Sequence, residues 1–196
     1  MTIAGIDVSA AGQGADFNWA AWRGKIGFAA IKISEGTGYA DPYAKRNIAG
    51  ARSIGCAVIG YHFLHAVDGA PQARWYLECA AKAGMKPGDN HAVDCEDLGL
   101  LGQTAATMDL VAAGFAGELR KHYQPGWNPV CYTEISMARE LAHMGSCPLW
   151  LANPSRMAVK SIGPWKQVSF EQVGQRGVDS DVFYGTSEQL AALAFR

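Results

Sequence analysis

The sequence predicts an α/β protein: a single β/α barrel of the TIM type, with eight strands and a ring of helices that is depleted in the C-terminal third. Eight short apolar runs, most ending in a polar or acidic residue, alternate with helical segments over much of the chain. Its 196 residues, 49% of them hydrophobic, are enough for one domain, residues 1–196, with a sizeable core. An open doubly wound sheet is the rival fold, but the sequence contains neither G-x-G-x-x-G nor a P-loop.

The predicted strands are nearly continuous in hydrophobicity, which is typical of strands buried on both faces. In chain order they are TIAGIDVS (2–9), GFAAIKISEG (27–36), CAVIGYHF (56–63), HAVDCED (91–97), PVCYTE (129–134), PLWLANP (148–154), KQVSFEQV (166–173) and VDSDVFY (178–184). This pattern favours parallel strands under a cover of helices.

The predicted helices are rich in alanine and have recognisable ends. Asp41 is a candidate cap followed by Pro42 in the first turn, Gly84 marks a helix end, and Thr104 is a further cap. The segments are residues 39–55, 69–89, 104–126 and a shorter one at 136–146. After the sixth strand the connections are too short for a full crossover helix.

Composition excludes several classes of function. The formal net charge of −1 provides no basic field for nucleic acid or an anionic membrane, and no apolar run approaches the ~20 residues of a spanning helix. The start, MTIAGIDVSA, lacks the features of a signal peptide. The five cysteines show no C-x-x-C spacing, so we expect reduced thiols rather than disulfides or a zinc ribbon. We therefore expect the protein to be made in a cytosol.

The motif AVDCED at 92–97 places acids at the end of a buried strand. Because alternate side chains of a strand share a face, Asp94 and Glu96 point the same way. Two like charges at this spacing repel, and one pKa is expected to rise. Taken alone, the motif also fits a solvated junction between strand and loop.

The other strand ends supply similar side chains. In such barrels the site lies at the carboxyl ends of the strands, so these residues are expected to meet at one rim. They are Asp7, Glu35, Tyr61 with His62, Asp94 with Glu96, Tyr132, Trp150 with Asn153, Gln172 and Asp179. Clustered carboxylates flanked by aromatic rings suit cleavage of a glycosidic bond, in which one acid protonates the leaving oxygen.

The motifs GIDVS (5–9), IKISEG (31–36), DP (41–42), GYHF (60–63) and VDCE (93–96) together resemble the family 25 glycoside hydrolases. These are the Chalaropsis-type lysozymes, which include many phage endolysins. Weaker similarities follow in CYTE (131–134), LWLA (149–152) and GVDSDVF (177–183), so the resemblance spans essentially the whole chain.

The resemblance implies an N-acetylmuramidase that cuts the β-1,4 bond between N-acetylmuramic acid and N-acetylglucosamine, without a metal or another cofactor. By motif, Glu96 resembles the general acid/base and Asp94 its partner, while Asp7, Glu35 and Asp179 resemble the other acids of the groove. The implied substrate-binding residues are Tyr61, His62, Tyr132, Trp150 and Gln172. The sequence departs from the family at Glu171, at Asn153–Pro154 and at Asp181, where a tryptophan, a tyrosine and an asparagine respectively are usual.

The implied partner is the glycan strand of bacterial peptidoglycan, with no nucleic acid or membrane, and the protein is expected to be a monomer. Without a signal peptide, it is expected to be made in the host cytoplasm and to reach the wall during phage lysis or as part of a virion. Two alternatives stay open: a metal-dependent polysaccharide deacetylase that uses His62, His65 and Asp94, and a non-catalytic phage tail or glycan-binding relative. Retaining, inverting and substrate-assisted mechanisms are all compatible with the sequence.

Overall fold

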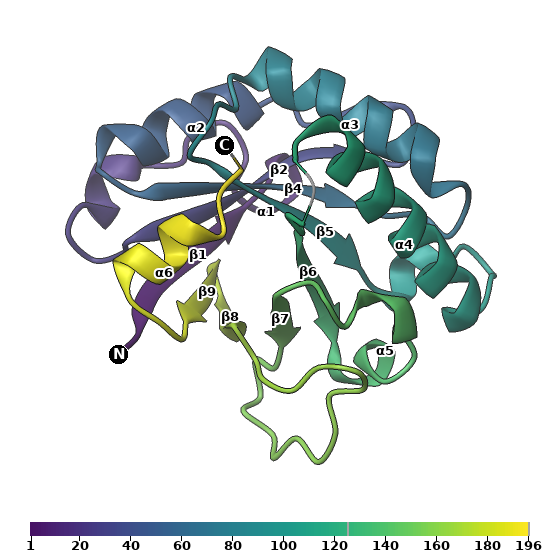
Figure 1. The fold of residues 1–196 in the computed structure, drawn as a ribbon. Coiled ribbons are helices and arrows are strands. Elements are labelled where there is room, and N and C mark those ends of the chain that lie inside the picture. Colours follow the sequence, from purple (N-terminus) through teal and green to yellow (C-terminus); the bar gives the residue numbers. More distant parts are fainter. Residues whose placement is uncertain (125, 196) are drawn as a thin grey trace.

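The strands form one sheet that closes on itself (Figure 1). The computed structural model describes residues 1–124 and 126–195, and within them the strand order is β1-β9-β8-β7-β6-β5-β4-β2-β3, with an additional β1–β2 pairing that closes an eight-stranded barrel. The bounds are β1 Ile3–Val8, β2 Phe28–Glu35, β3 Tyr39–Ala40, β4 Ala57–Phe63, β5 Asn90–Cys95, β6 Val130–Glu134, β7 Leu149–Ala152, β8 Phe170–Arg176 and β9 Val178–Phe183. The predicted barrel is confirmed, and β3 is a short antiparallel addition at the edge of β2.

One strand runs against the expected direction. β9 is antiparallel to both of its neighbours, β8 and β1, whereas the other barrel pairings are parallel. The reversal occurs at Gly177, whose φ of +77° favours glycine, so β8 and β9 form a hairpin. The start of β9 therefore lies at the same rim as the carboxyl ends of the parallel strands.

The helices cover only part of the barrel. The three long ones, α2 (Ala44–Ser53), α3 (Gly69–Ala83) and α4 (Ala105–His122), lie in the first two thirds of the chain and follow one side of the sheet (Figure 1). The shorter elements are α1 Ala10–Gln13, η1 Trp19–Trp22, η2 Asp97–Leu100, α5 Ile135–Ala138, η3 Ala142–Met144 and α6 Ser187–Ala192. In the described part of the chain no helix is both long and apolar enough to span a bilayer.

The predicted helix ends were only partly right. Thr104 caps α4 and Gly84 ends α3 in a left-handed conformation, as expected. Asp41 is not the cap of α2, but it accepts hydrogen bonds from the backbone N–H groups of Tyr43 and Ala10. The single helix predicted at 136–146 is wrong: Leu141 has a ψ of 62°, which separates α5 from η3.

The side chains inside the barrel are apolar at one end of its axis and polar at the other. Its lower part is filled by apolar side chains such as Phe28, Ile59, Phe170 and Phe183, and Gly5 leaves the space that the ring of Phe28 occupies. A separate apolar layer lies between the strands and the helices. Toward the rim formed by the carboxyl ends of the parallel strands, here called the carboxyl rim, the inward-facing residues are polar and charged, and a pocket opens there.

Candidate active site

A pocket of about 270 Å³ opens at the carboxyl rim, and all eight barrel strands contribute to it. Its lining residues are Asp7, Ser9, Lys32, Tyr61, Phe63, Asp94, Glu96, Tyr132, Trp150, Gln172, Gln175 and Asp179. Four of the five predicted acids therefore meet in one pocket, although their positions in the sequence are far apart. Asp179 joins them because β9 is antiparallel: a parallel strand would have placed its first residues at the opposite rim.

Asp94 and Glu96 occupy different depths at the end of β5. Asp94 is 8% exposed, and its Oδ1 atom is buried without a hydrogen-bond partner among the residues that the structure describes. Burial first, and then the negative charge of Glu96, raise the pKa of Asp94 well above its usual value. Glu96 is half-buried and faces the pocket, and burial also raises its pKa, while the Tyr132 hydroxyl and Lys32 lower it. The pair therefore retains protons at a pH where isolated carboxyls are ionised.

Asp7 on β1 is a second acid with a strongly shifted pKa. Burial and the charge of Asp179 raise the pKa of Asp7 to about 7. The Nε2 atom of Gln172 donates a hydrogen bond to Asp7 Oδ2 at 3.1 Å and opposes this shift. Asp179 lies opposite Asp7 in the β1–β9 register, and burial raises the pKa of Asp179 as well.

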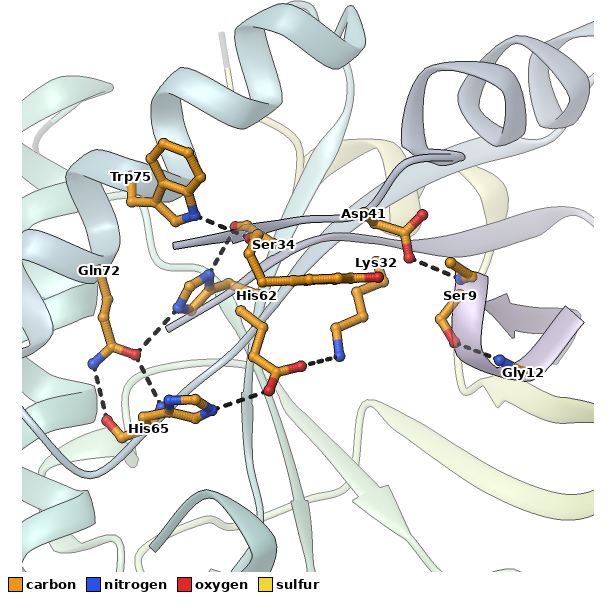
Figure 2. A network of polar contacts seen from close by, with 12 residues as sticks. Ser9, Gly12, Lys32, Ser34, Asp41, His62, His65, Gln72 and Trp75 are labelled. Atoms are coloured by element: carbon orange, nitrogen blue, oxygen red, sulfur yellow. Dashed lines mark hydrogen bonds and ion pairs between the residues drawn. The ribbon is translucent and has the colours of Figure 1, made fainter. Parts of the chain in front are cut away.

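Lys32 is the cation among these acids, and it is anchored at its outer side. A register shift in β2 between Lys32 and Ser34 turns Glu35 to the same side as Lys32. Lys32 Nζ lies 2.6 Å from Glu35 Oε2, and His65 Nε2 lies 3.1 Å from Glu35 Oε1 (Figure 2). These two partners lower the pKa of Glu35 despite its partial burial, so Glu35 is an ionised anchor at the edge of the pocket.

Residues 6–182 match the family model described as Glycosyl hydrolases family 25. The chain belongs to this family. Its structure resembles a family GH25 lysozyme from Aspergillus fumigatus, with a TM-score of 0.82, 28% identity and 99% of each chain covered. It also resembles a bacterial lysozyme from Streptomyces coelicolor, with a TM-score of 0.81 and 27% identity over 98% of this chain and 96% of that chain. The uncharacterized protein YegX of Escherichia coli O157:H7 is 31% identical over 217 residues, covering 97% of this chain and 73% of that protein.

As a family 25 member the chain is a glycoside hydrolase, which confirms the predicted enzyme class. The comparisons give no support to the deacetylase or to the non-catalytic relative. Among residues 1–124 and 126–195, no three His, Cys, Asp or Glu side chains are grouped so as to hold a metal ion.

Two residues predicted for this family 25 site lie outside the pocket. His62 is fully buried on the outer face of β4, where its ring stacks on Phe115. The ring also forms hydrogen bonds with Ser34 and Gln72 (Figure 2). Burial lowers the pKa of His62 to about 3, so the ring is neutral. The prediction that His62 contacts a sugar is therefore wrong. Glu35 does not line the pocket either, and acts on it through Lys32.

The aromatic side chains that line the pocket differ in how exposed they are to solvent. Tyr61 lines the pocket with Phe63, its neighbour on the inner face of β4. Tyr132 and Trp150 pack edge to face with ring centroids 5.0 Å apart, and both are more than nine-tenths buried. Trp150 is thus mainly a wall of the pocket rather than an open platform.

The sequence analysis missed Lys32 and Asp181 as members of this site. Lys32 interrupts the apolar run of residues 28–33, and this signal could have identified it. Asp181 lies two residues after Asp179, so the alternation of β9 puts both on the inner face. Its Oδ1 atom accepts a hydrogen bond of 3.0 Å from Trp150 Nε1, a contact between residues 31 positions apart that no local pattern indicates.

Proposed function

We propose that this glycosidase is an N-acetylmuramidase that cleaves the β-1,4 bond between N-acetylmuramic acid and N-acetylglucosamine in peptidoglycan. Two similar structures, from Trichobolus zukalii and Acremonium alcalophilum, are named muramidases, each at 26% identity, with TM-scores of 0.80 and 0.81. The observation that carries the proposal is the depth difference within the D-x-E pair: a buried, protonated Asp94 lies beneath a Glu96 that faces the pocket.

Glu96 is proposed as the general acid because its carboxyl faces the pocket and its pKa is raised. It gives its proton to the glycosidic oxygen as that bond breaks, and positive charge then develops on the anomeric carbon. Asp7 and Asp179 line the same pocket, so an ionised carboxylate at either position stabilises this charge. Asp94 supports Glu96 from below and is available to orient the acetamido group or the attacking water.

The proposed site of action is the bacterial cell wall. Two lysins share this fold, the LytC autolysin of Streptococcus pneumoniae at 16% identity and the CTP1L endolysin at 22%. We propose that the protein acts there as a monomer on glycan strands, and that it serves phage lysis. Lysis of host cells when the gene is expressed with a holin tests the last point.

The test is digestion of purified peptidoglycan followed by mass analysis of the new reducing ends. The wild-type enzyme is expected to release fragments that end in N-acetylmuramic acid. Glu96→Gln keeps the shape of the side chain but removes the proton donor, so turnover is expected to fall about 10²-fold or more. Glu78→Gln, on the exposed face of α3, is the matched control.

Two results would contradict the proposal. Glucosamine reducing ends, free peptides or free acetate would each assign the protein to another reaction class. Near wild-type turnover by Glu96→Gln, with circular dichroism showing an intact fold, would remove Glu96 from the role of acid.

A further inference from the structure

Asp181 is a buried carboxyl that the roles described above do not use. It lies on the inner face of β9, opposite Gly5 of β1 and opposite Gln172 of β8. Its side chain is 2% exposed, one layer deeper in the barrel than Asp179. Trp150 Nε1 donates to its Oδ1 atom at 3.0 Å, and its Oδ2 atom is buried without any donor in the described part of the chain.

This environment is unsuitable for an ionised carboxylate. One oxygen would lack a donor in a region that also contains Phe170 and Phe183, and a buried polar atom without a partner is costly. Burial, and then the charges of Asp7 and Asp179, raise the pKa of Asp181 well above its usual value. These conditions favour the neutral form of the carboxyl, whose proton needs an acceptor.

Asp7 is the acceptor that the strand register provides. Gly5 lies directly opposite Asp181, and Asp7 is the next inward-facing residue of β1, so Asp7 and Asp181 are diagonal neighbours on one face. Gly5 has no side chain, so β1 places no side chain opposite Asp181, and the space beside Gly5 is occupied by the ring of Phe28 from β2. Hydrogen bonding from Asp181 lowers the pKa of Asp7, whereas the charge of Asp7 raises the pKa of Asp181, and both effects favour a proton on Asp181.

We propose that Asp181 is a positioning residue: its protonated carboxyl, fixed by Trp150, donates a hydrogen bond to Asp7 from inside the barrel and holds Asp7 as a carboxylate that faces the pocket. With Gln172, this gives Asp7 two donors, from β8 and β9. Its relevance to turnover rests on the proposed function, in which an ionised Asp7 stabilises positive charge on the sugar.

Other charged groups around Asp7 do not replace this donor. Asp179 on β9 and Glu96 after β5 are acids that raise its pKa, and Asp94 on β5 is an acid at the same pocket. Lys32 on β2 is a cation in the lining, but its ammonium is bound by Glu35. Loss of the Asp181 donor is therefore expected to raise the pKa of Asp7 further.

Infrared spectroscopy of the enzyme without substrate tests the protonation directly. With isotope-labelled aspartate, the wild-type enzyme at neutral pH is expected to show the carbonyl stretch of a protonated carboxylic acid. Asp181→Asn is expected to remove this band, and Asp7→Asn is expected to retain it. Asp68→Asn, at the exposed start of α3, is the control that leaves this signal unchanged. Loss of a carboxylate band instead of an acid band in Asp181→Asn would overturn the proposal. This result does not depend on whether peptidoglycan is the substrate.

Kinetics then test the positioning role. The side chain in Asp181→Asn can still accept a hydrogen bond from Trp150 and donate one to Asp7. The side chain in Asp181→Leu has a similar shape but can form neither hydrogen bond. In the pH profile of kcat/KM, Asp181→Leu is expected to move the acidic limb to higher pH by about one pH unit. At pH values below that limb, kcat/KM then falls about tenfold. Asp181→Asn is expected to keep the limb at or below its wild-type pH. Identical profiles for the two variants would overturn the role. If the leucine variant does not fold, the infrared comparison and the limb position in Asp181→Asn decide.

Discussion

The raised pKa of Asp7 predicts that the pocket lowers the stability of the protein. The pKa rises from 3.8 to about 7 on folding. Between these pH values the folded chain retains a proton that the unfolded chain has released, so the free energy of unfolding falls as the pH rises from 3.8 to about 7. Asp7→Asn removes this titration, and its amide oxygen can still accept the hydrogen bond from Gln172.

The size of the effect follows from the shift. A pKa difference of about 3 corresponds to at most about 4 kcal/mol in the free energy of unfolding. Because the Asp7 carboxyl also faces water in the pocket, we expect an effect of about 2 kcal/mol. For a chain of this length 1 kcal/mol moves the melting temperature by about 2–4 °C. Asp7→Asn is therefore expected to melt about 4–8 °C above wild type at pH 8, and near wild type at pH 4, with strongly reduced turnover.

The assay is thermal unfolding followed by circular dichroism from pH 4 to pH 8 for wild type, Asp7→Asn and the control Asp16→Asn. Asp16 is exposed in the segment after α1, so its variant is expected to follow the wild-type curve. If the difference in melting temperature between Asp7→Asn and wild type does not grow with pH, the gain is unrelated to the ionisation of Asp7 and the prediction is wrong.

The remaining predictions concern the barrel interior and the anchor of the pocket cation. Gly5→Ala would bring its Cβ atom into a clash with the ring of Phe28, so we expect the free energy of unfolding in chemical denaturation to fall by about 1–3 kcal/mol. Changing Phe28 to Leu as well is expected to restore part of this loss. Equal stability of the single and double variants would contradict this. Glu35→Gln removes the carboxylate 2.6 Å from Lys32, whose ammonium then pairs with the pocket acids and lowers their pKa values. The alkaline limb of the pH–rate profile is expected to move to lower pH, and an unchanged profile would contradict the anchoring role.

The barrel and the position of the pocket were predictable because both follow from local rules. Strand periodicity and the acids at strand ends are visible in the sequence, and parallel strands bring their carboxyl ends together. Asp7, Asp94 and Glu96 reach the pocket for this reason. Their catalytic roles stay predictions that the proposed variants test.

The positions of His62, Asp179 and Asp181 depend on contacts that no local rule encodes. His62 follows Tyr61 in the strand, so only the choice of face separates a pocket residue from a core residue, and the partners of His62 on β2 and α3 decide it. Asp179 reaches the rim through the hairpin at Gly177, which reverses β9. Asp181 is defined by Trp150, a partner from another strand.

The balance of charge explains how such a pocket keeps an acid ready for catalysis. Its described lining has the acids Asp7, Asp94, Glu96 and Asp179, with Asp181 beneath them, and the one cation of that lining, Lys32, is neutralised by Glu35. Because so many carboxyls cannot all ionise in a shared, poorly solvated space, some protons stay bound near neutral pH. The deepest acids, Asp94 and Asp181, have the most strongly raised pKa values, which leaves ionised charge to the acids that face the pocket. In the proposed mechanism, such a site supplies a proton from Glu96 together with negative potential at the anomeric carbon, and both favour breaking a glycosidic bond.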